Sequence, residues 1–165
     1  MKKILLISDT HGYIDERILY FASLADEVWH AGDVGSLEVI SKLKEVSNLK
    51  AVYGNIDGNE IRQLLPLNNI FLCEQVKVFI THIGGYPKNY KPGIKFLLEE
   101  HKPDIFICGH SHILKVIRDS TLDVLHMNPG ACGKHGFHKI RTLLRFEINK
   151  KEIENLEVVE LESKN

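Results

Sequence analysis

The segment Lys3-Ile4-Leu5-Leu6-Ile7-Ser8-Asp9-Thr10-His11-Gly12 places two ligand-type side chains directly after an apolar run. The run at 3–7 is short and almost wholly apolar, which is typical of a central strand buried on both faces. Asp9 and His11 would then lie in the loop beyond the carboxyl end of that strand. The same order, a buried strand followed by Asp, Asn or His, recurs along the chain.

The rest of the pattern predicts an α/β fold. We expect strands at 3–7, 27–30, 49–53, 69–73, 76–81, 104–108, 115–118, 122–127, 142–148 and 157–161, and helices at 14–25, 37–43, 60–65 and 94–100. Ser36 is the expected N-cap of the second helix. Most late strands alternate apolar and polar residues, as half-exposed antiparallel strands do. We therefore expect two packed sheets, with a βαβ-like first half and a second half that is mostly β-meander. No linker interrupts the pattern, which favours one domain over residues 1–165.

Composition excludes several classes of protein. The 165 residues are 44% hydrophobic and 26% charged, and 21 basic and 22 acidic side chains give a net charge of -1. No broad positive field is available for nucleic acid, so we do not expect a nucleic-acid partner. No signal peptide or membrane-spanning run is visible, which favours a cytoplasmic protein with no membrane contact. The three cysteines form no CxxC pair, and we expect them to pack as small apolar residues in a reducing compartment.

Five short segments carry the ligand-type residues, and each follows a predicted strand. They are Ser8-Asp9-Thr10-His11-Gly12, Ala31-Gly32-Asp33-Val34, Gly54-Asn55-Ile56-Asp57, Thr81-His82 and Gly109-His110-Ser111-His112. Singly, each is explained as a turn, a cap or a surface histidine. Loops beyond the carboxyl ends of parallel strands gather at one edge of a sheet, so together the five segments predict one cleft.

The residue types predict metal binding. Asp and Asn offer oxygen and His offers nitrogen, a mixture that suits divalent transition metals. Seven such side chains are too many for one tetrahedral ion. They suit two ions that lie roughly 3.5–4 Å apart and share a bridging carboxylate. Such a pair can hold both negative oxygens of a phosphate.

In this order, the segments D-x-H, G-D, G-N, H and G-H-x-H resemble those of the calcineurin-like metallophosphoesterases. The sequence His30-Ala31-Gly32-Asp33-Val34 and the later Asn128-Pro129-Gly130 resemble its small single-domain branch of bacterial and archaeal phosphodiesterases. The resemblance extends from Lys3 to about Ile148. It implies a four-layer αββα sandwich, in which two mixed β-sheets are flanked by helices.

The resemblance also implies an assignment of metal ligands. Asp9, His11 and His112 would hold the first ion, Asn55, His82 and His110 the second, and Asp33 would bridge the two. Mn²⁺ is the first choice of metal, with Zn²⁺, Fe, Ni²⁺ and Co²⁺ as alternatives because availability decides much of the occupancy.

The resemblance implies a phosphodiesterase that acts on a small phosphoester substrate. The charges of such a site favour attack by a metal-bound hydroxide. Asp33 and Asn55 are the expected catalytic residues, since the Asn55 amide can also donate a hydrogen bond to a phosphate oxygen. Asp9 as a phosphorylated nucleophile is an alternative, which the histidine-rich downstream motifs disfavour.

The third motif departs from the family pattern. Many relatives carry Gly-Asn-His-Asp there, whereas this chain has Ile56, which can neither donate nor accept a proton. We expect Asp57 to orient a ligand histidine such as His11 or His82 from outside, a role we favour over general acid. Without a general acid, the rate should depend strongly on the leaving group.

Other polar residues have open roles. The loop 84–92 is either a mobile lid or substrate rim or, the favoured interpretation, an ordinary surface loop. His30 is expected to pack or to support the site, and His126 is given a smaller chance of touching substrate. The basic run at 134–141 is either a rim that attracts phosphate or a solvated loop or subunit contact, and a homo-oligomer is compatible with the sequence.

Two other functions compete with a phosphodiesterase. The metallophosphoesterase-like subunit of the retromer coat is a protein-interaction scaffold that has lost ligand histidines, whereas here all seven ligand positions are filled. Larger relatives are nucleases, but this chain lacks their added domains and a strong basic field.

Overall fold

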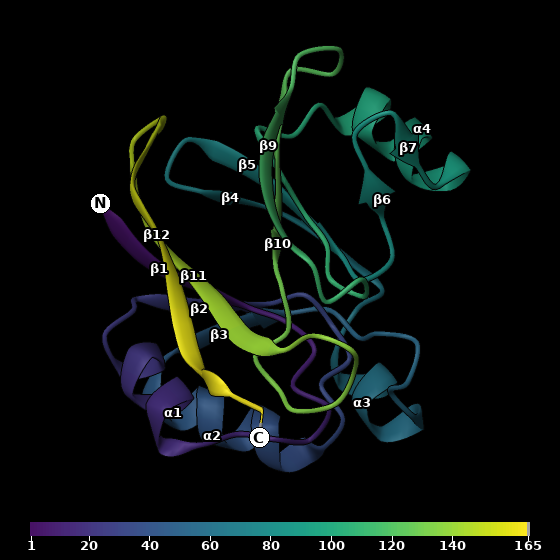
Figure 1. Cartoon of the computed structure of the whole chain (residues 1–165). Coiled ribbons are helices and arrows are strands. Elements are labelled where there is room, and N and C mark those ends of the chain that lie inside the picture. The colour runs from purple at the N-terminus through teal and green to yellow at the C-terminus, as the bar shows by residue number, and fades with distance from the viewer. Residues whose placement is uncertain (165) are drawn as a thin grey trace.

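The computed structural model describes residues 1–164 and contains two five-stranded sheets packed face to face (Figure 1). The strands of the first sheet, in spatial order, are β12 (Glu152–Ser163), β11 (Ile140–Asn149), β1 (Lys2–Ile7), β2 (Glu27–His30) and β3 (Asn48–Ala51). Those of the second are β4 (Asn68–Cys73), β5 (Val76–Thr81), β8 (Ile105–Ile107), β10 (Val124–Pro129) and β9 (Leu114–Asp119). Both sheets mix parallel and antiparallel pairs.

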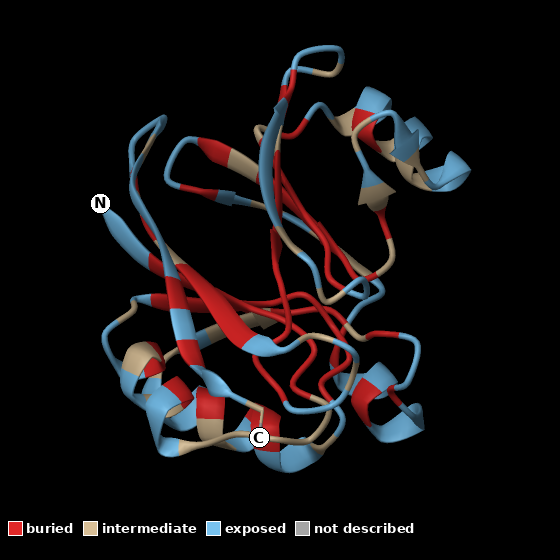
Figure 2. Ribbon diagram, viewed as in Figure 1, coloured by how far each residue is buried: buried red, intermediate tan, exposed pale blue. Residues whose placement is uncertain are grey.

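Helices cover the outer faces of both sheets. The helices α1 (Glu16–Ser23), α2 (Leu37–Val46) and α3 (Asn59–Leu64) pack on the first sheet, and α4 (Pro92–His101) packs on the second. Buried residues are continuous along the inner strands, while the outer faces of the helices are exposed (Figure 2). The expected four-layer αββα sandwich is confirmed.

Strand β1 is buried on both faces, as its apolar run predicts. Leu5 and Ile7 point to the layer shared with α1 and α2, whereas Ile4 and Leu6 point into the core between the sheets. The strand has neighbours on both edges, since it pairs in parallel with β2 and antiparallel with β11. It therefore fixes the loop that carries Asp9 in the centre of the molecule.

The prediction of a mostly meandering second half is wrong. Strands β5 and β8 are parallel, as are β8 and β10. After β10 the chain leaves the second sheet, and β11 pairs with β1 in the first. The crossover from β5 to β8 is made by α4, which buries Leu98 against Phe79 and Phe106. Burial on both faces favours the parallel arrangement of β8.

Several local predictions are also corrected. β3 ends at Ala51 rather than at 53, and β12 is longer than predicted. Ser36 occupies the N-cap of α2, but its side chain makes no capping hydrogen bond. The loop at 84–92 contains a small hairpin of β6 (Gly85–Tyr86) and β7 (Asn89–Tyr90).

The cysteines and the helices agree with the composition. All three cysteines are buried free thiols, as expected. Among the described residues, no helix is both long and apolar enough to cross a bilayer.

Candidate metal centre

The five ligand-bearing loops meet at one edge of the sandwich because their strands run in parallel. β1, β2 and β3 end side by side in the first sheet, and β5 and β8 do so in the second. Backbone hydrogen bonds then tie the loops together, from Asp9 N–H to Gly32 O at 3.0 Å and from Gly109 N–H to His82 O at 3.0 Å. The predicted cleft is therefore built from both sheets.

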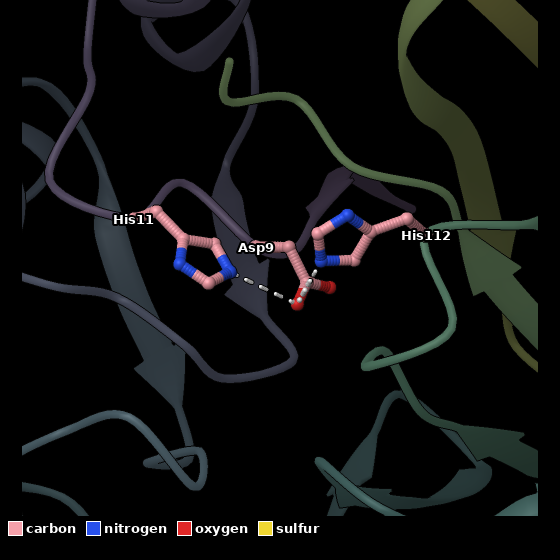
Figure 3. Close-up of side chains that lie close together, drawn as sticks. All are labelled: Asp9, His11 and His112. Atoms are coloured by element: carbon pink, nitrogen blue, oxygen red, sulfur yellow. Dashed lines mark ion pairs between the residues drawn. The ribbon is translucent and has the colours of Figure 1, made fainter. Parts of the chain in front are cut away.

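Asp9, His11 and His112 form a first cluster with metal-ligand geometry (Figure 3). Asp9 Oδ1 lies 3.1 Å from His112 Nε2 and 3.7 Å from His11 Nε2. The other oxygen, Oδ2, accepts hydrogen bonds from Ser8 Oγ at 2.6 Å and from the His110 N–H at 3.2 Å. Oδ2 is thus held by the protein, which leaves Oδ1 for a cation.

Asp33, His82 and His110 form a second cluster. Asp33 Oδ2 lies 3.1 Å from His82 Nε2, and His110 Nδ1 lies 3.1 Å from Asn55 Oδ1. Asn55 therefore lies with this group, as the family resemblance implies. His82 Nδ1 donates to Ala31 O at 2.7 Å, which leaves Nε2 as the atom that can bind a cation.

Asp33 lies between the two clusters. Its Oδ2 is 3.1 Å from His82 Nε2 in the second cluster and 3.4 Å from His11 Nε2 in the first. Its Oδ1 accepts a hydrogen bond from the Ile56 N–H at 3.1 Å. A carboxylate in this position can bridge two ions.

The unpaired polar atoms of the site fit a cation. Asp9 Oδ1, His11 Nε2 and His82 Nε2 are buried, and none has a hydrogen-bond partner among the described residues. Buried polar atoms normally have one, so three that converge on one space fit the binding of a cation. Their lone pairs repel one another unless a proton or a metal ion lies between them.

The electrostatics of the site agree with this interpretation. Burial alone would raise the pKa of Asp9, but the neighbouring His11 and His112 rings outweigh it and hold that pKa well below its usual range. Burial lowers the pKa of His82, yet the nearby carboxylates of Asp33 and Asp9 outweigh it and raise that pKa. The buried carboxylates thus attract positive charge into the cleft.

Most of the candidate ligands have a strained backbone conformation. Five candidate ligands that are not glycine have positive φ: Asp9, His11, Asp33, His110 and His112, at 56°, 46°, 53°, 70° and 59°. This conformation is uncommon for residues with a Cβ, and it persists only where the surroundings impose it. Its occurrence at five of seven candidate ligands marks this edge as a functional site.

Two motif glycines are required by close approach of the chain. A Cβ on Gly54 would lie 2.0 Å from Asp33 Oδ1, and one on Gly109 would lie 2.1 Å from Ser8 Oγ and 2.8 Å from Asp9 Oδ2. Glycine precedes Asn55 and His110 because the backbone there contacts the carboxylates directly.

Asp57 has a different role from the one predicted. Its carboxylate does not contact His11 or His82; it accepts backbone N–H bonds from Val34 at 3.1 Å, Gly35 at 2.8 Å and Gly54 at 2.8 Å. These donors flank Asp33 and Asn55, so Asp57 fixes the loops that carry those two residues rather than a histidine ring.

His30 supports the site from beneath. The Gly32 N–H donates to His30 Nδ1 at 3.1 Å, so the other ring nitrogen carries the hydrogen and donates to Thr10 Oγ1 at 2.9 Å. The Thr10 hydroxyl then donates to Val34 O at 2.8 Å. Burial lowers the pKa of His30 to about 4, which keeps the ring neutral in this network.

The 133–138 loop contributes residues that the motifs do not reveal. His138 Nε2 donates to Gly133 O at 2.8 Å, which leaves Nδ1 to accept from His112 Nδ1 at 3.2 Å. This bond orients the His112 ring so that Nε2 faces Asp9. The His135 ring lies 4.7 Å from that of His11. Only the basic run at 134–141 signalled this loop in the sequence.

Arg141 does not belong to a basic rim. It is fully buried, donates from Nε to Cys132 O at 2.6 Å, and pairs with Asp15 at 2.9 Å. Asp15 also caps α1 by accepting from the Ile18 N–H. Arg141 therefore anchors the 133–138 loop to the start of that helix.

Replacing His138 with alanine should weaken metal binding about 10- to 100-fold, because His112 would lose the partner that orients its ring. A competitive Mn²⁺ titration measures the affinity. His101→Ala is the matched control, since His101 lies at the far end of α4. The Mn²⁺ affinity of this variant should equal that of the wild type. An unchanged affinity in the His138 variant would show that the ring needs no such support.

Comparison with known proteins agrees with the geometry. Residues 1–151 match the model of the calcineurin-like phosphoesterase superfamily domain. A probable metallophosphoesterase of Methanocaldococcus jannaschii is 30% identical over 132 residues, which are 76% of this chain and 66% of that protein.

Solved structures share the fold. An archaeal protein characterised as a novel phosphodiesterase superposes with a TM-score of 0.78 at 25% identity, over 96% of this chain and 99% of that one. Vps29 from Entamoeba histolytica superposes with a TM-score of 0.76 over 97% of this chain and 99% of that one, and at 18% identity it supports the fold alone. The chain therefore belongs to the calcineurin-like phosphoesterase superfamily.

Proposed function

We propose that residues 1–165 act as one metallophosphoesterase domain, a cytoplasmic phosphodiesterase with a dinuclear, Mn²⁺-preferring centre. The observation that carries the proposal is the pair of adjacent ligand clusters with Asp33 between them. Their mixed oxygen and nitrogen donors suit Mn²⁺, Zn²⁺ or Fe better than a hard cation such as Mg²⁺. The likeness to an archaeal phosphodiesterase supports a diester substrate.

When bound, two divalent cations supply charge neutralisation for the phosphate and a water of lowered pKa as nucleophile. Asp33 and Asp9 would hold positive charge in the cleft, and His82 and His110 would complete the two ligand sets. Burial and the neighbouring His82 lower the pKa of His110, which favours the neutral ring that can bind a metal.

Asn55 would act on the substrate as well as on the metal. Its Oδ1 lies beside His110, so its amide nitrogen can donate a hydrogen bond to a phosphate oxygen. This bond would stabilise charge that develops on the phosphate. Asp57 would keep Asn55 in place through the Gly54 N–H.

The direct test is hydrolysis of bis(p-nitrophenyl) phosphate by the purified chain with Mn²⁺, compared with p-nitrophenyl phosphate as monoester. We expect turnover that depends on the metal and favours the diester. A chelated sample and a panel of Zn²⁺, Fe²⁺, Ni²⁺ and Co²⁺ serve as controls. Absence of turnover with every metal would favour the alternative, a protein-interaction scaffold with the same fold.

A further inference from the structure

A cleft of about 630 Å³ adjoins the candidate metal centre. Gly109 and His110 line it, and His110 also belongs to the second ligand cluster. The remaining walls come from the β6–β7 hairpin and the adjoining parts of β9 and β10. A group bound here would therefore be continuous with a phosphate held at the metal centre, and the volume suits a small organic ligand. We call this space the hairpin cleft.

The hairpin wall is aromatic and held in place. Tyr86 is 47% exposed and its ring lies 4.9 Å from Lys115 Nζ. Tyr90 is anchored, because its hydroxyl donates to Asp119 Oδ2 at 2.8 Å. The Lys91 N–H donates to Gly84 O at 3.2 Å, which closes the base of the hairpin. The cleft thus offers a preformed aromatic surface for a flat ring.

Close packing fixes the base of the hairpin further. A Cβ on Gly84 would lie 2.4 Å from the Phe106 ring, so the chain passes directly against the second sheet there. Cys108, which follows β8 directly, donates from Sγ to Gly85 O at 3.4 Å. The hairpin is therefore tied to the strand that precedes His110. Its position beside the cleft favours the alternative that 84–92 is a substrate rim.

The cleft offers hydrogen-bond donors and positive charge. Lys91 and Lys115 line it, and among its described lining residues there is no Asp or Glu. Ser111 Oγ accepts from Asn128 Nδ2 at 3.1 Å and from the Ile113 N–H at 3.2 Å, which leaves its own hydrogen free to donate. This chemistry attracts a ligand rich in acceptors and repels a cationic one.

We propose that the hairpin cleft binds the nucleoside of a nucleoside 5′-phosphodiester, an inference that rests on the phosphodiesterase function. A nucleobase supplies a flat ring to stack on Tyr86 and acceptors for Lys115 and Ser111. A choline head group would be repelled by the two lysines, and glycerol has no face to stack. The cleft therefore sets which diester is used, while the metal centre sets the reaction.

Matched substrates test this assignment. Thymidine 5′-monophosphate p-nitrophenyl ester, methyl p-nitrophenyl phosphate and p-nitrophenyl phosphorylcholine share one leaving group and differ in the retained group. Tyr86→Ala and Lys115→Ala should each lower kcat/KM on the thymidine ester about tenfold, the loss expected for a base-stacking contact. Neither variant should change kcat/KM on the methyl ester, and Lys115→Ala should raise kcat/KM on the choline ester.

Two control variants sharpen the result. Tyr86→Phe keeps the ring and should behave as the wild type. Phe96→Ala removes an exposed aromatic side chain of α4 that does not line the cleft, and it should change nothing. The assignment would be overturned if Tyr86→Ala and Lys115→Ala lost kcat/KM equally on all three substrates, or on none of them.

A binding measurement separates this inference from the proposed function. Calorimetry on the Mn²⁺-loaded protein compares adenosine 5′-monophosphate with phosphocholine, with no turnover required. The nucleotide should bind more tightly, and Tyr86→Ala should remove the difference. If the protein binds both equally, the inference fails even where esters are hydrolysed. If it prefers the nucleotide but hydrolyses no ester, the phosphodiesterase proposal fails instead.

Discussion

Replacing Asp33 with asparagine is expected to lower Mn²⁺-dependent diester hydrolysis on the order of a thousandfold or more. Asparagine preserves the shape of the side chain and the oxygen that accepts from the Ile56 N–H. It removes the charge of the oxygen that lies between His11 and His82. The variant should therefore fold normally but bind fewer than two metal ions, as measured by kcat and by the metal content of dialysed protein.

Asp104→Asn is the matched control for this prediction. Asp104 also accepts a backbone N–H, from Lys77 at 2.7 Å, but it lies outside both ligand clusters. The activity and metal content of the Asp104→Asn variant should equal those of the wild type. Full activity in the Asp33 variant, with two ions still bound, would show that no bridging carboxylate is needed.

The rate of hydrolysis should fall steeply as the leaving group becomes more basic. Ile56 is 47% exposed beside the site, and its backbone N–H donates to Asp33 Oδ1. Its side chain, at the position where many relatives carry histidine, cannot protonate a departing alkoxide. General acid catalysis is typically worth about 10²–10⁴ in rate. We expect a loss of that order between p-nitrophenyl and alkyl esters with the same retained group, measured as log kcat against leaving-group pKa.

Ile56→His is the informative variant for this second prediction. It should raise the rates of alkyl esters and leave the p-nitrophenyl ester almost unchanged, which flattens the plot. A wild-type plot that is already flat would mean that another residue supplies the proton. His135, whose ring lies beside His11, would then be the first residue to replace.

Local sequence pattern was sufficient to predict the edge where the site lies. The buried run at 3–7 and the strands before Asp33, Asn55, His82 and His110 could be recognised from short segments of local sequence. Parallel neighbours end at the same edge, so the convergence of their loops followed from topology. The pairing of Asp9, His11 and His112 followed instead from the family resemblance, and the geometry brings those three together.

Contacts between distant segments could not be predicted in this way. The run at 134–141 looked basic and solvated, but Arg141 is buried because it meets both Cys132 O and Asp15. His138 reaches His112 only because β11 returns to pair with β1. The sequence predicts a histidine partner for Asp57, whereas its carboxylate accepts from three backbone N–H groups, two on the Asp33 loop and one on its own loop. No local periodicity encodes these partners.

The stoichiometry of metal binding tests the central claim most directly. Anomalous scattering from crystals of the Mn²⁺-loaded protein locates each ion without reference to activity. We expect two peaks, one within the cluster of Asp9, His11 and His112 and one within the cluster of Asp33, His82 and His110, with Asp33 contacting both. A single peak, or none at these residues under saturating Mn²⁺, would contradict a dinuclear centre.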